Sequence, residues 1–295
     1  MRYRWLKILS KMPLGVHHCF ADYLIYPLMY YVARYRRKIV DKNIRNAFPD
    51  WTEVQRRDLR KRFYRQFADL IVETIYGYSA SDAEMREHMQ LVDEDKLAQA
   101  CHQYGGAITT LAHLGTWEWV SDFGRRYAVE GIQECNVYRR LKNRYFDQLM
   151  LDIRNQRGGE CVEKDSLLRR LIQLRQSELK PMYGMLSDQK PSPRNAHVWT
   201  TTFLNQDTAF LCGAEVLSKK FGYPLFYAYI TSTKRGCYTA KFIPMQSDNL
   251  TEEYARLLER NILEQPHLWL WSHNRWKYNP HPNALQCSHI ELERR

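Results

Sequence analysis

The sequence predicts an α/β fold, with a central mixed sheet covered by helices and a helical extension at the N-terminus. Three observations lead to this prediction. From residue 107 onward, short apolar runs typical of buried strands alternate with amphipathic segments typical of helices. Residues 53–76 carry apolar side chains at helical spacing. Ahead of them lies a basic segment that encloses one apolar stretch, residues 19–33.

The individual elements follow from local patterns. Buried strands are expected at residues 107–112, 134–138 and 182–187, with a hairpin formed by residues 225–232 and 238–244. Helices are expected at residues 53–76, 116–127, 143–156, 167–175, 207–221 and 251–263. Thr52 is a suitable N-cap for the first helix, Gly77 a suitable terminator, and Thr251 a suitable cap for the last helix.

A chain of 295 residues is long enough to bury a large core in one elaborated domain. The sequence contains no internal repeat, low-complexity tract or long flexible linker. Three parts are predicted: a membrane-associating segment at residues 1–40, a main domain at residues 41–280 and a tail at residues 281–295.

The net charge of +11 is concentrated at one end of the chain. Residues 1–65 contain 16 Lys and Arg against 5 Asp and Glu, and the remainder of the chain is balanced. Basic segments attract anionic lipids, nucleic acids or acidic proteins. Nucleic acid is not expected as a partner, because the excess charge does not follow an aromatic-lined sheet.

The apolar stretch at residues 19–33 is shorter than the roughly 20 residues that a spanning helix needs. Asp22 and Pro27 interrupt it, and a basic cluster at residues 34–38 follows it. An interfacial or shallowly inserted helix is therefore expected, with the rest of the chain on the cytoplasmic side of the membrane. The sequence lacks an evident cleavage site for a signal peptide.

Seven cysteines are scattered along the chain without a Cys-x-x-Cys motif. Their odd number and irregular spacing favour reduced thiols over a disulfide scaffold, and no zinc site is expected.

The most informative motif is His113-Leu-Gly-Thr-Trp-Glu118, which follows the predicted strand 107–112. Active sites of open α/β sheets collect at the carboxyl ends of strands. A histidine titrates near neutrality and can take a proton from a hydroxyl group, and a carboxylate can orient it. His113 and Glu118 are therefore candidates for a general-base dyad, with His113 at the helix entry and Glu118 inside the helix. The spacing alone is also common by chance.

Two further segments follow predicted strands. Arg139 and Arg140 are candidates for binding phosphate, although surface basic residues have the same pattern. Asp188 is a candidate either for contacting a substrate or for holding an active-site arginine, and a plain turn aspartate is the alternative. No Ser or Cys stands in a nucleophile-elbow pattern, which argues against a covalent intermediate on the protein.

Taken together, these segments resemble the bacterial lipid A biosynthesis acyltransferases over residues 34–278. The resemblance rests on Asn43-Ile-Arg-Asn-Ala-Phe-Pro, on His113 with Glu118, on Tyr138-Arg-Arg-Leu-Lys-Asn143 and on Asp188-Gln189. The closing segment around Trp269 and Trp271 also looks like the family's C-terminal segment. The chain departs from the family where a Phe-Phe-Gly step is common, because Phe203-Leu204-Asn205 stands there.

The resemblance implies a glycerolipid acyltransferase-like fold and an acyl transfer from acyl carrier protein to a hydroxyl of a phosphorylated glycolipid, a lipid A precursor. His113 would be the general base and Glu118 its orienting partner, while Arg139, Arg140 and Asp188 would bind substrate. The expected partners are acyl carrier protein, the glycolipid and membrane lipids at the cytoplasmic face of the inner membrane. Beyond the acyl-carrier-protein thioester, no cofactor or metal is implied.

Three alternatives remain open at this stage: an acyltransferase of the same fold with another acceptor, such as lysophosphatidate or an amino-acid lipid; a non-catalytic lipid-binding protein; and a serine or cysteine hydrolase. Arg275 and Lys277 are expected to lie at the membrane, to close the site or to pack in a C-terminal strand. His273 is interpreted as a partly buried structural residue.

Overall fold

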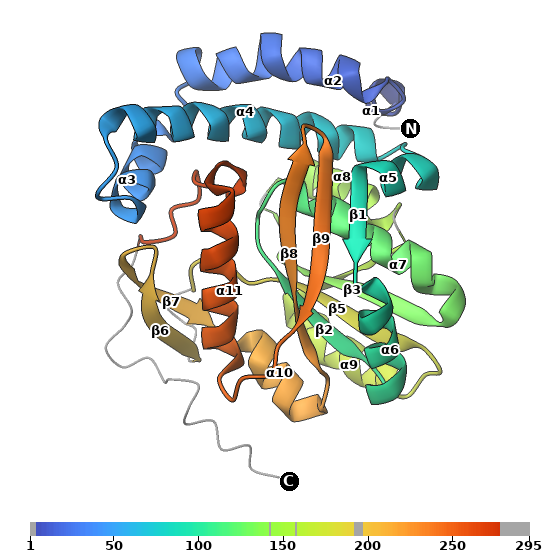
Figure 1. The fold of residues 1–295 in the computed structure, drawn as a ribbon. Coiled ribbons are helices and arrows are strands. Elements are labelled where there is room, and N and C mark those ends of the chain that lie inside the picture. The colour runs from blue at the N-terminus through green and yellow to red at the C-terminus, as the bar shows by residue number, and fades with distance from the viewer. Residues whose placement is uncertain (1–3, 142, 157, 192–196, 278–295) are drawn as a thin grey trace.

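The structure is a computed structural model that describes residues 4–141, 143–156, 158–191 and 197–277 (Figure 1). The predicted tail at residues 281–295 lies outside this part of the chain, and the division into three parts stays a prediction.

A seven-stranded mixed sheet forms the centre of the molecule, in the order β1-β9-β8-β2-β5-β3-β4. The strands are β1 (Met89–Val92), β2 (Ala107–Leu111), β3 (Ile132–Tyr138), β4 (Glu160–Glu163), β5 (Lys180–Leu186), β8 (Leu225–Lys234) and β9 (Cys237–Pro244). Strands β8, β2, β5, β3 and β4 run parallel to one another. Strand β9 is antiparallel to β8, and β1 is parallel to β9. The predicted mixed α/β fold is therefore confirmed.

Helices cover the sheet on both faces and at one end (Figure 1). The α-helices are α1 (Arg4–Ser10), α2 (Leu14–Phe20), α3 (Arg37–Ala47), α4 (Glu53–Gly77), α5 (Asp82–His88), α6 (Glu94–Tyr104), α7 (Asp122–Tyr127), α8 (Arg144–Asn155), α9 (Leu167–Arg175), α10 (Gly213–Phe221) and α11 (Leu250–Glu264). Short 3₁₀ segments are η3 (Trp117–Ser121), η4 (Ala128–Glu130), η5 (Lys164–Ser166) and η6 (Pro266–Leu268).

The long helix α4 begins as predicted, at a capping box. The Thr52 side chain accepts from the Gln55 backbone N–H, and the Gln55 side chain accepts from the Thr52 backbone N–H. Three buried charged residues on this helix, Arg60, Asp69 and Glu73, were not anticipated from its apolar spacing. Helix α4 is thus buried on more than one side, between the sheet and an outer helical layer.

Three local predictions were wrong. Residues 207–211 belong to β7 (Gln206–Leu211), which pairs with β6 (Val198–Phe203) in a separate antiparallel sheet, and only α10 remains helical. Residues 116–127 form η3 and then α7 rather than one continuous helix. The cap of α11 is Asn249, whose side chain accepts from the Glu252 backbone N–H. The side chain of Thr251 instead donates to Glu215.

The N-terminal segment forms an outer layer against α4, as Figure 1 shows for α2. After α2 the chain continues as the π-helical segments η1 (Ala21–Ile25) and η2 (Leu28–Val32). Several large apolar side chains of this layer are exposed: Phe20, Tyr23, Leu24, Leu28, Tyr31 and Val32. Among the described residues, no helix combines the length and the apolar character required to cross a membrane.

The expectation that all thiols are reduced is wrong at one position, because Cys212 is disulfide-bonded. The free cysteines within the described part of the chain are Cys19, Cys101, Cys135, Cys161 and Cys237.

Candidate active site

The predicted site residues converge because three neighbouring strands end at one edge of the sheet. His113 follows β2, Asp188 follows β5, and Arg139 and Arg140 follow β3. Strand β5 lies between β2 and β3 and is parallel to both. The carboxyl ends of parallel neighbours meet at the same edge, which is where ligands bind in open α/β sheets.

His113 and Asp188 form a directly bonded pair. The Nδ1 atom of His113 lies 2.6 Å from Oδ1 of Asp188. The other carboxylate oxygen, Oδ2, accepts from the His113 backbone N–H at 3.2 Å and from Nε1 of Trp269 at 3.0 Å. Because an ionised carboxylate only accepts hydrogen bonds, Nδ1 must carry the proton, and Nε2 keeps its lone pair.

The environment keeps Asp188 ionised. Burial by itself would raise the pKa of its carboxyl group, but the positive charge available on His113 and the hydrogen bonds from His113 and Trp269 outweigh burial and lower the pKa to about 2. The Nε2 atom of His113 lies 3.1 Å from the Gln189 side-chain nitrogen, which is placed to donate to it, and both residues line the pocket described below. The ring of His113 is thus oriented with Nδ1 toward Asp188 and Nε2 toward Gln189 and the pocket.

The segment after His113 is held tightly. Leu114 pairs with Trp269 in an isolated antiparallel bridge, and the Gly115 backbone N–H donates to the Leu268 carbonyl at 3.0 Å. Gly115 has a φ of +52°, and a Cβ there would lie 2.8 Å from the Tyr238 ring. The Trp117 ring meets the His113 ring edge-on, with centroids 4.7 Å apart. The backbone of residues 113–118, called the catalytic loop here because it carries the candidate base, is therefore held from several sides.

Glu118 has a different partner from the one predicted. Its carboxylate accepts two hydrogen bonds from Arg154 on α8, at 2.6 and 2.8 Å. Burial disfavours the charge of this guanidinium, but Glu118 attracts it and the net effect raises the pKa of Arg154. Among the described contacts, the carboxylate bonded to His113 is that of Asp188, whereas that of Glu118 is bonded to Arg154.

A pocket of about 490 Å³ opens beside His113. It lies over β2, β5 and β3 and is bounded by η3 and α8. Four of the five predicted site residues line it: His113, Glu118, Arg139 and Arg140. Asp188 lies buried behind His113. Arg140 is exposed and pairs with Glu163 at 3.0 Å.

The walls of the pocket are mainly apolar near His113 and become polar farther along the strands. Strand register places Leu111 beside Leu186, and Thr109 beside Gly184, which also pairs with Asn136. At the far end lies Glu134, and burial raises the pKa of its carboxyl group to about 8. Thr109 lies four residues before His113 in the chain, and extended backbone covers roughly 13 Å over that length. Beside Leu111 and Leu186 the pocket can therefore hold an apolar chain that ends at His113, whereas its far end is polar.

The C-terminal segment contacts the His113–Asp188 pair through Trp269 and packs beside it. Trp269 bonds to Asp188, whereas Arg275 is buried, donates to the Ala209 carbonyl and stacks on the Phe210 ring. Burial lowers the pKa of Arg275 to about 10 and that of His273 to about 4. Trp269 and Arg275 pack the segment against the β6–β7 sheet. His273 is partly buried, and its Nε2 accepts from the Lys190 backbone N–H at 3.4 Å.

Sequence reasoning missed Arg154 and Gln189 as site residues. Arg154 stands four residues after Met150, which stands four after Phe146, and all three line the pocket. This helical spacing was visible in the sequence, but nothing in it indicated which face of α8 meets the sheet. Gln189 directly follows Asp188 and belongs to the same motif.

Comparisons with known proteins give the family of the chain. No curated protein sequence matches the chain. Residues 4–278 match the family model described as bacterial lipid A biosynthesis acyltransferase, which covers the whole sheet, the catalytic loop and the N-terminal helical layer. The chain therefore belongs to the bacterial lipid A biosynthesis acyltransferase family.

Proposed function

We propose that this acyltransferase moves a fatty acyl chain from acyl carrier protein to a hydroxyl group of a phosphorylated lipid A precursor, with His113 as the general base. The observation that carries the proposal is the His113–Asp188 pair at the end of an apolar pocket. Family membership supports the reaction class.

The chemistry follows from the geometry. Nε2 of His113 takes the proton of the acceptor hydroxyl as the oxygen attacks the thioester carbonyl. The new C–O bond of the ester forms and the C–S bond breaks, and the imidazolium returns the proton to the departing thiolate. Asp188 stabilises the imidazolium through Nδ1–H. No protein nucleophile is required, and no cofactor is proposed beyond the thioester co-substrate.

The pocket and its rim suit the two substrates. An acyl chain would lie along the apolar wall beside Leu111 and Leu186. Arg139 and Arg140 at the rim are placed to bind a phosphate, either of the glycolipid or of the carrier's phosphopantetheine. Glu118, through its bidentate bond to Arg154, would shape the pocket wall between the acyl chain and the phosphate site.

The first test is acyl transfer by the purified protein, with labelled acyl carrier protein and a phosphorylated lipid A precursor. The wild type should acylate the lipid, and His113→Ala should lower kcat by about 10³-fold or more because the base is gone. Full activity in His113→Ala would overturn the mechanism. If the wild type is inactive on this acceptor but acylates lysophosphatidate or an amino-acid lipid, the mechanism stands and the acceptor is wrong.

Gly184→Val should shift donor preference toward shorter chains. Gly184 lines the pocket, and a Cβ there would lie 2.5 Å from Oδ1 of Asn136, so the Asn136 side chain must shift and valine would narrow the pocket at this depth. We expect kcat/KM to fall at least about tenfold for long-chain donors, the order expected when methylenes lose their pocket. Short-chain donors, which end before residue 184, serve as the internal control. An equal loss for both donor lengths would contradict this position of the acyl chain.

The N-terminal layer is proposed to dock on the membrane surface at the cytoplasmic face. Its exposed apolar side chains are accompanied by the basic residues that follow at 34–38. Replacing Leu24 and Val32 with glutamate should lower binding to anionic vesicles by about tenfold or more, measured by co-sedimentation. Val129→Glu, at a fully exposed apolar residue outside this layer, is the matched control and should bind as the wild type does. Equal binding by all three proteins would refute the docking surface.

A further inference from the structure

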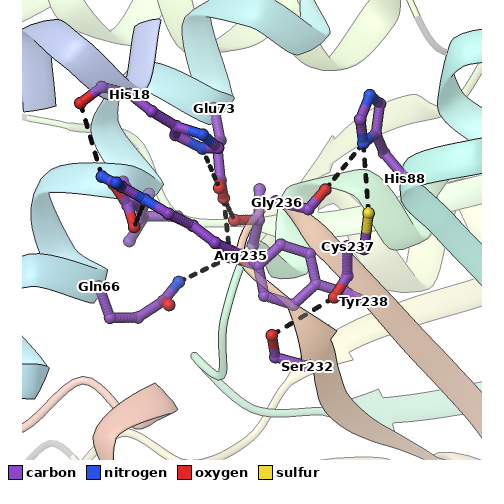
Figure 2. A network of polar contacts seen from close by, with 12 residues as sticks. His18, Gln66, Glu73, His88, Ser232, Arg235, Gly236, Cys237 and Tyr238 are labelled. Carbon is purple, nitrogen blue, oxygen red and sulfur yellow. Dashed lines mark hydrogen bonds and ion pairs between the residues drawn. The ribbon is translucent and has the colours of Figure 1, made fainter. Parts of the chain in front are cut away.

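A buried carboxylate on α4, that of Glu73, joins three parts of the chain at the catalytic loop. Its side chain is completely inaccessible to solvent. Oε1 lies 3.0 Å from Nε2 of His18 on α2. Oε2 accepts from the Thr116 hydroxyl, and also from the Tyr238 hydroxyl at 2.9 Å. Figure 2 shows His18 and Tyr238 approaching Glu73 from different elements.

The backbone of Glu73 takes part as well. Its carbonyl accepts from Nε1 of Trp119 at 3.2 Å. Thr116 and Trp119 flank Glu118 in the sequence and lie three and six residues after His113. One helical residue therefore anchors the loop at two points that bracket the pocket-lining segment.

We propose that Glu73 is a positioning residue for His113, and that it ties the N-terminal helical layer to the catalytic loop through His18. The proposal deepens the proposed function, because it assumes that His113 is the reacting base. Glu73 itself touches neither the pocket nor the reacting atoms, and it acts through Thr116.

The surroundings explain why a carboxylate is suitable here. A buried carboxylate is retained only when hydrogen bonds or charges compensate its lost hydration. Glu73 has three side-chain partners, and Gln66 further holds the Tyr238 hydroxyl at 2.8 Å. Removing the Thr116 hydroxyl leaves His18 and Tyr238 bonded to Glu73, so the loop can be released from Glu73 selectively.

The neighbouring carboxylate, Asp69, provides a contrast. It stands one helical turn before Glu73 and is also buried, but it bonds to Arg235, at 2.6 and 2.9 Å. Arg235 also binds Asp22 of η1, at 2.8 Å. His18, Asp69 and Glu73 lie close enough together to suggest a metal site. Their oxygens, however, are already engaged by the guanidinium and the hydroxyls, so a clamp of hydrogen bonds accounts for the cluster.

The test uses Thr116→Val, which keeps the shape of the side chain and removes its hydroxyl, with Thr116→Ser as the conservative rescue. We expect Thr116→Val to lower kcat by about 10- to 100-fold with KM within about twofold, because a small misplacement of the base costs rate and not ground-state binding. Thr116→Ser should recover most of kcat. Glu73→Ala should lower kcat by a similar factor. The double variant Thr116→Val/Glu73→Ala should lose no more kcat than either single variant.

Asp69→Asn is the matched control on the same helix. It should lower the melting temperature as Glu73→Ala does, but leave kcat within about twofold of the wild type. If Asp69→Asn loses as much kcat as Glu73→Ala, the network is merely structural and the proposal is overturned. Unchanged kcat in Thr116→Val would overturn it equally.

A second measurement does not depend on activity. Hydrogen–deuterium exchange of peptides that cover residues 112–119 should accelerate in Thr116→Val and Glu73→Ala but not in Asp69→Asn. If His113→Ala proves fully active, the proposed function fails, while the exchange result still decides whether Glu73 holds the loop. If exchange at residues 112–119 is unchanged in both Thr116→Val and Glu73→Ala, Glu73 does not position the loop.

Discussion

Asp188→Asn is expected to lower kcat by about 10³-fold while the fold remains intact, because the substitution reverses the tautomer of His113. Two donors, the His113 backbone N–H and Nε1 of Trp269, converge on Oδ2. They would select the amide oxygen of the new side chain for that position. The amide NH₂ would then face Nδ1 of His113, where a proton now sits.

With an NH₂ group opposite, Nδ1 must become the acceptor, and the proton moves to Nε2. The imidazole then has no lone pair toward the pocket and cannot take a proton from the acceptor hydroxyl. Substrate binding is unaffected by this change, so KM should stay within about threefold of the wild type.

The measurement combines steady-state transfer rates with the ¹⁵N chemical shifts of the His113 ring, which report the tautomer directly. Thermal unfolding controls for stability, since Asp188 also holds Trp269. A variant with an inverted tautomer and full kcat would show that His113 is not the base. A variant that keeps the wild-type tautomer yet loses kcat would show that Asp188 acts through its charge alone.

The sequence was sufficient to place His113 and Asp188, because each follows an apolar run that becomes a buried strand. The contact between His113 and Asp188 could not be predicted from the sequence. The two residues lie 75 positions apart, and they meet only because β5 is the neighbour of β2 in the sheet. Strand order depends on long-range packing, which no local pattern records. Asp188 was accordingly weighed as a substrate or arginine contact and not as the partner of His113.

Glu118 illustrates the opposite difficulty. Its closeness to His113 in the sequence suggested a contact, yet η3 carries its side chain toward α8 and Arg154. A similar limit explains the error at residues 207–211. Strand β7 exists only through its pairing with β6, whereas local spacing resembled a helix that truly begins at Gly213. Capping boxes and strand ends are local and were predictable, but partners across the fold were not.

The role of Glu118 can be decided by removing it together with Arg154. The carboxylate and the guanidinium are both largely buried and bonded at two points. Removing one partner of such a pair typically costs about 3–5 kcal/mol, because the other charge is left uncompensated, whereas replacing both is often nearly neutral. Glu118→Leu and Arg154→Met should each destabilise the protein by this amount, and the double variant should recover to within about 1 kcal/mol of the wild type.

Activity then separates two roles for Glu118. If it acts by holding Arg154 in the pocket wall, each single variant should lose about 100-fold in kcat/KM, and the double variant should regain most of that loss together with its stability. If Glu118 instead supports the charge of His113, the double variant should fold well and remain as inactive as Glu118→Leu. The bidentate bond to Arg154, and the Asp188 carboxylate already present at Nδ1 of His113, favour recovery. A stable but inactive double variant would restore Glu118 to the catalytic pair.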